Sequence, residues 1–248
     1  MIDMTGMILL ANSLVDGFFQ SNGIGQGIVV LQIVASFAMV TCIIGKWREL
    51  HFIESETRRF LNDFSIGEDV LEYYLKRRPV DNDGIIGLYR ETCDRLLKLF
   101  NPNVRSLLVG HDDGEGRSST LLTAREIELV RGTCEHALDE EENRIEKGMS
   151  VIATVVSLSP MLGLLGTVWG VLDAFAEMGS AGSANLATIA PSISSALVTT
   201  VVGLIVAIPG VIAFNVMNGM IRSITSDMEG FADELTGRIA CEFQGKGL

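Results

Sequence analysis

The sequence predicts an all-α integral membrane protein with three transmembrane helices, whose long helices extend into a cytoplasmic helical body. The first observation is a mean hydropathy of +0.35, which is high for a chain of 248 residues of which 20% are charged. Such an average requires charged and apolar residues to be segregated along the chain. The second observation is that segregation itself, because residues 1–45 and 148–221 contain no Lys or Arg, while 16 of the 19 basic residues lie in 46–147.

This composition disfavours several classes of protein. A soluble globule, a disordered chain and a secreted disulfide scaffold do not concentrate apolar residues in this way. The net charge of −12 argues against a nucleic-acid binder, which needs a basic face to release counterions. No pattern for nucleotide binding or nucleophilic catalysis stands out, and Cys134 with His136 falls short of a four-ligand metal site. We therefore expect neither an enzyme nor a protein with a cofactor or metal.

Three stretches are long enough to cross a bilayer, which takes about 20 apolar residues. The predicted transmembrane segments are residues 23–45, 148–177 and 186–217. Buried core helices are the alternative, but three such runs in one chain argue against it. Residues 1–22 form an N-terminal segment that either lies at the membrane interface as an amphipathic helix or simply leads into the first span. Residues 178–185 are too polar and Gly-rich to continue a span and form a short loop.

Basic residues set the orientation of these spans, because the cytoplasmic flanks of membrane helices carry an excess of Lys and Arg. Lys46 closes the first span, Lys147 opens the second and Arg222 closes the third. The N-terminal segment and the loop between the second and third spans contain neither residue type. We therefore place those two parts on the outer side of the membrane, and residues 46–147 and 218–248 in the cytoplasm.

The cytoplasmic segment is predicted to be helical, because its apolar residues recur at steps of three and four. Pro and Gly in RRPVDNDG (77–84) and the polar run GHDDGEGRSS (110–119) interrupt it. The predicted helices are 46–63, 66–78, 84–100 and 120–147, the first and last running on from the first and second spans, with a C-terminal helix or tail at 218–248. The acidic run DEEEN (139–143) is either a solvated helix face, which we favour, or a partner site.

Polar residues inside a span need a partner or a water-filled path, so they are the first candidates for function. In the third span, Ser192, Ser195 and Thr199 recur at steps of three and four and share one helix face. In the second span, Gly166 and Gly170 permit close approach of another helix. Taken singly, such hydroxyls are explained by hydrogen bonds to their own helix backbone. A hydroxyl face beside small residues also suits a narrow polar path enclosed by an oligomer, or a groove for another protein's helix.

Two longer motifs carry a family resemblance. Residues 160–170 fit the pattern P-x-x-G-L-x-G-T-V-x-G, and residues 190–209 fit A-P-x-I-x-x-A-L-x-x-T-x-x-G-L-x-x-A-I-P. With these motifs in this order, the stretch 150–217 resembles the last two spans of the MotA/TolQ/ExbB proton channel family, and most closely its ExbB/TolQ branch. The rest of the chain is similar to the family in topology. Flagellar MotA-type stators have four spans and fit less well.

The resemblance implies a subunit of an ion-driven motor in the bacterial inner membrane, with a periplasmic N-terminus and a cytoplasmic C-terminus. It implies a homopentamer in the lipid bilayer around a dimer of an ExbD/TolR-like single-span partner, whose transmembrane Asp takes up and releases the ion. Ion flow then drives mechanical work on a TonB-like or TolA-like client. This chain has no Asp or Glu in the hydrocarbon part of any span, so the resemblance assigns the titrating carboxylate to the partner.

The resemblance also assigns residues to the ion pathway and to helix packing. Thr167 and Thr200 match the family's pore threonines, and Thr199, Ser195 and Ser192 add hydroxyls beside them. A hydroxyl both donates and accepts, so it is able to hold a water or replace part of an ion's hydration shell. The residues expected to pack or shape the helices are Pro160, Gly163, Gly166, Gly170, Pro191, Gly203 and Pro209.

Two positions depart from the family pattern. Ser195 stands where ExbB and TolQ usually carry a glutamate, five residues before Thr200, which leaves a proton relay through a ring carboxylate in doubt. A pore lined by hydroxyls is compatible with H⁺ and with Na⁺, and both stay open. Asp173 replaces a neutral or His residue, and is either a charge that attracts cations at the outer mouth or an ordinary interfacial charge. The second hypothesis for the chain is a non-conducting membrane scaffold or anchor for a transport or secretion complex.

Overall fold

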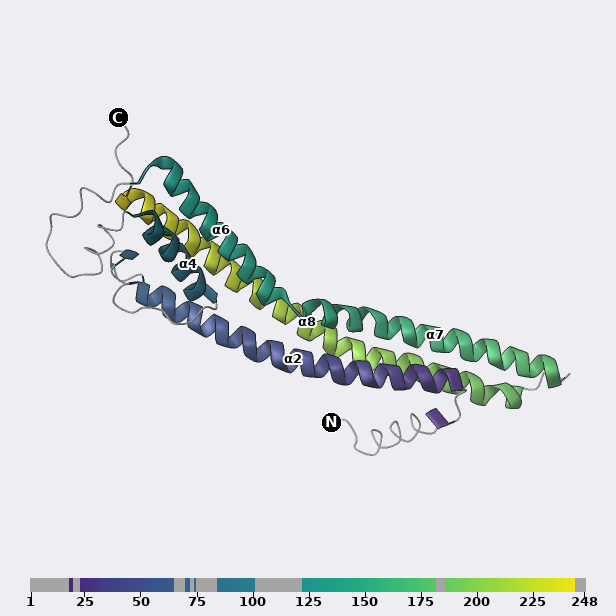
Figure 1. Ribbon diagram of the computed structural model, residues 1–248. Helices are drawn as coiled ribbons and strands as arrows, with labels where there is room; N and C mark the ends of the chain where they lie inside the picture. The colour runs from purple at the N-terminus through teal and green to yellow at the C-terminus, as the bar shows by residue number, and fades with distance from the viewer. Residues whose placement is uncertain are drawn as a thin grey trace. The chain divides into compact units, whose positions relative to one another are not determined.

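The computed structural model describes residues 18–19, 23–64, 70–71, 74, 84–100, 122–181 and 186–243, and these are almost entirely helical. The main helices are α2 (Gly23–Phe64), α4 (Gly84–Leu99), α6 (Ala124–Glu146), α7 (Met149–Ala181) and α8 (Leu186–Phe243) (Figure 1). No strand occurs among the residues that the structure describes. Three helical stretches are long and apolar enough to cross a membrane. The predicted fold class, an all-α membrane protein with three spans, is confirmed.

Some predicted features lie wholly or largely outside the described residues. They are the N-terminal amphipathic helix in 1–22, most of the helix at 66–78, the polar loop at 110–119, and residues 182–185 of the loop between the second and third spans.

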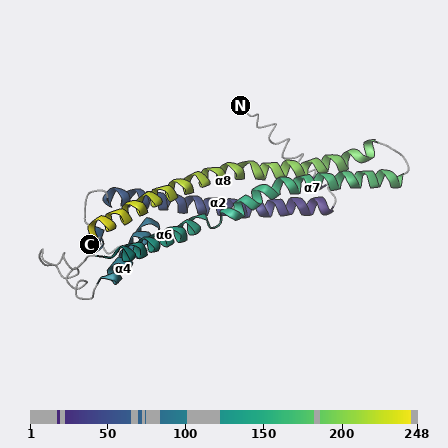
Figure 2. The ribbon, with the colours of Figure 1, turned by 90° about the horizontal axis from the view of Figure 1, so that it is seen from above.

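The chain divides into two compact units. We call Met1–Trp47 with Gly148–Met217 the transmembrane unit, and Arg48–Lys147 with Asn218–Leu248 the charged unit. Helices α2 and α8 each contribute one part to each unit, whereas α7 belongs to the transmembrane unit and α4 and α6 belong to the charged unit. Within the transmembrane unit, α2, α7 and α8 lie side by side in both views (Figures 1 and 2).

Most of the large outward-facing side chains of the transmembrane unit are apolar. Phe37 on α2, Met161 on α7 and Ile212 on α8 are between 61% and 72% exposed. The backbone hydrogen bonds of a helix are made within the helix, so such segments present mainly apolar side chains to their surroundings. This surface suits contact with lipid tails.

The chain turns between α6 and α7, where the sequence predicts one rod running from 120–147 into the second span. Lys147 takes φ −57 and ψ 129, values outside the helical region, and Gly148 takes φ +92. Glycine adopts a positive φ without the steric cost that a Cβ brings, and it commonly ends helices for that reason. The prediction of an unbroken rod is therefore wrong at this point, whereas α2 does run unbroken from Gly23 to Phe64.

Helices α7 and α8 approach each other at three glycines of α7. A Cβ placed on Gly163 would lie 2.8 Å from the Cα of Thr200, and one on Gly166 would overlap the side chain of Thr199. A Cβ on Gly170 would likewise overlap that of Ala196. Only glycine permits this separation. We call this contact, which runs from Gly163 to Gly170 on α7, the α7–α8 seam.

Helix α2 packs against the same pair through a buried amide. Gln32 is fully buried, and its Nε2 donates a hydrogen bond of 3.1 Å to the carbonyl of Ser159. Gly203 on α8 faces both groups, since a Cβ there would lie 2.6 Å from the Ser159 carbonyl oxygen and 2.9 Å from the Gln32 amide nitrogen. The three helices therefore meet at a buried polar contact.

The core of the charged unit is aromatic. Phe60, Phe64, Tyr89 and Phe231 pack together, mostly edge to face, with ring centroids 5.1 to 6.2 Å apart, and all four are buried. The Tyr89 hydroxyl finds a partner in the carbonyl of Val70. Aromatic pairs in edge-to-face geometry stabilise a core beyond the area that they bury. This cluster ties α2, α4 and α8 together within the unit.

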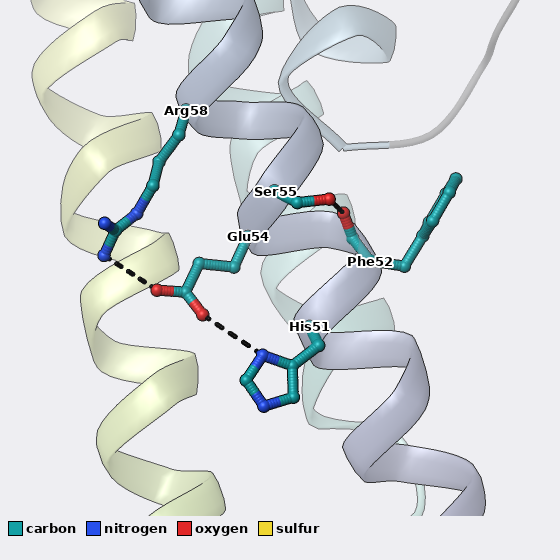
Figure 3. Close-up of polar contacts among 5 residues, drawn as sticks. All are labelled: His51, Phe52, Glu54, Ser55 and Arg58. Atoms are coloured by element: carbon teal, nitrogen blue, oxygen red, sulfur yellow. Dashed lines mark hydrogen bonds and ion pairs between the residues drawn. The ribbon is translucent and has the colours of Figure 1, made fainter.

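The surface of the same unit carries local ion pairs. On α2, Glu54 accepts a hydrogen bond of 2.8 Å from Arg58 and lies 3.8 Å from His51 Nδ1 (Figure 3). Ser55 donates to the carbonyl of Phe52. Exposed pairs at this spacing contribute about 0.3–0.5 kcal/mol each. Such pairs are typical of a solvated helix face.

One residue of the acidic run on α6 is structural. Asp139 and Glu140 are exposed and Glu142 is half-buried, but Glu141 is only 8% exposed. Its Oε1 accepts a hydrogen bond of 2.9 Å from the backbone N–H of Gly84, the first residue of α4. The first N–H groups of a helix lack partners inside it, and a carboxylate there also complements the helix dipole. Glu141 therefore caps α4.

We expect Gly163→Ala to weaken the α7–α8 seam. The new methyl would press on the backbone of Thr200, and overpacking of this kind costs about 1–3 kcal/mol. The measurement is the thermal unfolding of the purified protein in detergent. Gly179→Ala is the matched control, because a Cβ there meets nothing within 4 Å. Equal stability of the two variants would contradict the proposed tightness of the seam.

We expect Glu141→Ala to destabilise the charged unit by about 1–3 kcal/mol, since it leaves the buried Gly84 N–H without its acceptor. Glu140→Ala removes an exposed neighbour and should change stability by less than about 0.5 kcal/mol. Denaturant unfolding followed by circular dichroism compares the two. A loss of the same size in both would show that the acidic run acts only through its total charge.

Candidate functional site

Two hydroxyls of α8 converge on one carbonyl of α7. Thr199 Oγ1 lies 3.1 Å from the carbonyl oxygen of Gly163, and Thr200 Oγ1 lies 2.9 Å from the same oxygen. Both distances suit hydrogen bonds in which the hydroxyl donates. They are possible because Gly163 has no side chain to keep the helices apart. The contact joins the two helices at the seam through polar groups within a membrane-spanning unit.

Thr199 and Thr200 differ in their exposure. Thr199 is 1% exposed and also lies 2.7 Å from the carbonyl of Ala196, so its single hydroxyl hydrogen serves one of two acceptors at a time. Thr200 is half-buried in the isolated subunit. Both oxygens keep lone pairs that are able to accept from water or contribute to the hydration of a cation. Thr200 is the better placed of the two to meet a partner outside the subunit.

The other predicted pathway hydroxyls bond to their own helices. Thr167 donates to the carbonyl of Leu164 at 2.7 Å, and Ser195 donates to that of Ser192 at 2.9 Å. The described hydrogen bonds include none that joins Thr167 to Thr199 or Thr200. The structure therefore brings the two α8 threonines together at Gly163, and places Thr167 one residue after Gly166 on the neighbouring helix.

Beyond Gly170, the seam continues to a polar contact at the last part of α7. Ser192 Oγ lies 3.3 Å from Glu177 Oε2, which links α8 to the last part of α7. A small cavity of about 10 Å³ lies inward of this pair, between Asp173, Ser195 and Thr199. A cavity of that size has room for a single water molecule. Asp173 and Glu177 are the only acidic residues in the described part of the transmembrane unit.

The predicted helix-shaping residues fall into two groups. Gly163, Gly166 and Gly170 form the seam, and Gly203 faces Gln32, as described above. Pro160 lies inside α7, and Pro191 and Pro209 lie inside α8. Proline removes one backbone donor, which membrane helices tolerate where neighbouring groups satisfy the freed carbonyl.

Sequence reasoning missed two residues of this region. Gln32 lies in the first span, where a buried amide is the same signal of function as the hydroxyls of the second and third spans. Glu177 is the last residue of the predicted second span. Its proximity to Ser192 depends on how the chain returns from α7 to α8, which the sequence does not specify.

Comparison with known proteins shows which proteins this chain is related to. It matches the MotA/TolQ/ExbB proton channel family over residues 113–230. It is 33% identical over 228 residues to the Tol-Pal system protein TolQ of Haemophilus influenzae, a match that covers 89% of this chain and 91% of that protein.

Two shorter matches agree. The biopolymer transport protein ExbB of Xanthomonas campestris pv. campestris is 38% identical over 108 residues, which is 44% of this chain and 43% of that protein. The Tol-Pal system protein TolQ of Pseudomonas aeruginosa is 42% identical over 98 residues, which is 40% of this chain and 42% of that protein. With its three membrane-spanning helices, the chain belongs to the TolQ/ExbB branch of the MotA/TolQ/ExbB proton channel family.

Proposed function

We propose that this chain is the ring-forming subunit of an ion-driven motor in the bacterial inner membrane. Five copies surround a dimer of an ExbD/TolR-like single-span partner, with the N-terminus periplasmic and the C-terminus cytoplasmic. The flow of H⁺ or Na⁺ moves the partner within the ring and works on a TonB-like or TolA-like client. The observation that carries this proposal is the Thr199–Thr200 pair on the Gly163 carbonyl, in a unit whose spans hold no mid-membrane acid.

The division of labour follows from the chemistry of the groups. A carboxylate in hydrocarbon is costly and titrates, so it is the natural carrier of a proton or ligand of Na⁺. The partner supplies that carboxylate in this proposal. Thr200 presents a hydroxyl oxygen at the seam, and its hydrogen is held by the Gly163 carbonyl. Its lone pairs accept from the protonated acid or from a water shared with the carboxylate, so one group serves both charge states of the acid.

The energy available is sufficient for this task. One elementary charge that crosses about 100 mV releases about 2.3 kcal/mol. Five equivalent subunits would give the partner a set of positions of equal energy, separated by small rotations. A bias of that size favours one neighbouring position over another by roughly fiftyfold, because 1.4 kcal/mol corresponds to a factor of ten.

A non-conducting scaffold is the second candidate. It is favoured by Thr167 and Ser195, whose hydroxyls donate to backbone carbonyls of their own helices. It is also favoured by the presence of Ser195 where ExbB and TolQ usually carry a glutamate. Flux through liposomes that hold this chain and its partner separates the two functions. A scaffold gives no potential-driven flux.

We expect Thr200→Val to abolish most ion flux while the complex still assembles. Valine keeps the shape of threonine and removes the hydroxyl. A hydrogen bond to a charged group is worth about 1.5–3 kcal/mol, which corresponds to a loss of roughly tenfold to hundredfold in rate. Thr154→Val is the matched control, because Thr154 is exposed and its hydroxyl bonds to the Ser150 carbonyl of its own helix. Full flux in Thr200→Val would remove this threonine from the pathway.

The conducted ion is tested in the same vesicles. We expect H⁺, so flux under a fixed membrane potential should follow external pH and should not change when Na⁺ is replaced by choline. A flux that disappears without Na⁺ and persists across pH would instead establish a sodium pathway, which the two adjacent threonine hydroxyls also permit.

A further inference from the structure

Two cavities of the transmembrane unit meet at one carboxylate. The outer cavity, of about 460 Å³, lies between the start of α2 and the last part of α7, where Asp173 and Glu177 line it. The inner cavity is the one of about 10 Å³ described above. Asp173 and Trp169 line both. The side chain of Asp173 is half-buried, as expected for a group at the boundary between an open space and an enclosed one.

The inner cavity is lined by oxygen-bearing side chains and by glycines. Asp173 contributes a carboxylate, and Ser192, Ser195 and Thr199 contribute hydroxyls. Gly166 and Gly170 bring Thr199 and Ala196 of α8 close to α7 at this point. The hydroxyls of Ser195 and Thr199 donate to backbone carbonyls, so their lone pairs are what they offer to a guest. Oxygen lone pairs beside one negative charge form a set of ligands for a hydronium ion or for a sodium ion that has lost its water shell.

The outer cavity adds a second negative charge. Asp173 and Glu177 are four residues apart on α7 and therefore lie on the same helix face. Like charges at this spacing repel, and a cation near both relieves the repulsion. Clefts lined by charge of one sign raise the local concentration of counter-ions.

We propose that these two cavities form a cation access site within the single subunit. In it, Asp173 passes a hydronium or sodium ion from the outer cavity to the hydroxyls of Ser195 and Thr199. Thr199 shares the Gly163 carbonyl with Thr200, so the site ends beside the threonine that faces the partner. The proposal rests on the proposed function, and it places the access route between α7 and α8 of each subunit.

A structural role for Asp173 makes a different prediction. The first turn of α2 borders both cavities, and the first N–H groups of a helix, which have no acceptor within the helix, attract a carboxylate. Asparagine keeps an oxygen that accepts from those groups but has no charge. Asp173→Asn therefore separates the roles, because only cation access depends on the charge.

The experiment measures flux at fixed membrane potential as a function of external cation concentration. The chain and its partner are reconstituted together, with proton and sodium gradients as separate arms. We expect Asp173→Asn to raise the half-saturating concentration of the conducted ion by about tenfold, the low end of what focused charge achieves, with the maximal flux retained. Asp173→Glu should restore the wild-type value within a few-fold. Asp227→Asn is the control, since Asp227 is an exposed residue of the charged unit and should have no effect.

Each outcome bears on one proposal. If the wild-type complex carries no flux, the proposed function fails. If it does carry flux and Asp173→Asn leaves the half-saturating concentration unchanged, the access site is overturned while the function stands. A loss of maximal flux without a shift in concentration dependence also overturns it, in favour of the structural role. Should Asp173→Asn fail to assemble, Glu177→Gln decides, with a smaller rise expected and no change contradicting the site.

Discussion

The arrangement of the transmembrane unit depends on the close contact between α7 and α8. Lipid tails are as apolar as leucine side chains, so burial of apolar surface gives two membrane helices little reason to associate. Packing at short range and hydrogen bonds must supply the attraction instead. The seam provides both, since Gly163 allows the backbones to approach and its carbonyl accepts from Thr199 and Thr200. The proposed pathway hydroxyls are therefore also structural bonds of the seam.

This double use of the threonines has a consequence for mechanism. A hydroxyl whose hydrogen is directed to a fixed carbonyl has a fixed orientation, and its lone pairs then point in defined directions. Such preorganised groups stabilise a charge without first having to rearrange. Ser195 and Thr167 are oriented too, but by carbonyls of their own helices, so their hydroxyls do not join α7 to α8.

The fold class is predictable from the sequence because the requirements of a membrane-spanning helix leave a clear pattern of residues. A charge is costly in hydrocarbon, so each span is an uncharged stretch of about 20 residues and the basic residues lie at its ends. The sequence also predicts a packing role for Gly166 and Gly170, which share one helix face, and both glycines lie against α8. The break at Gly148 is not predictable, because nothing in the local sequence distinguishes a glycine that ends a helix from one that continues it. The cap formed by Glu141 on α4 was hidden for a related reason, as it joins residues 57 positions apart. The cavity shared by Asp173 and the α8 hydroxyls likewise depends on the register of two helices, which motif spacing does not fix.

The most direct measurement of the central claim compares this chain alone with the chain and its single-span partner, in vesicles of the same composition under the same potential. The claim is that the subunit supplies oriented hydroxyls and the partner supplies the titrating acid. It predicts no flux from the chain alone, flux with the partner, and loss of that flux when the partner's transmembrane Asp is replaced by Asn. Equal flux from the chain alone would contradict the account, because the described spans contain no mid-membrane acid to carry the ion.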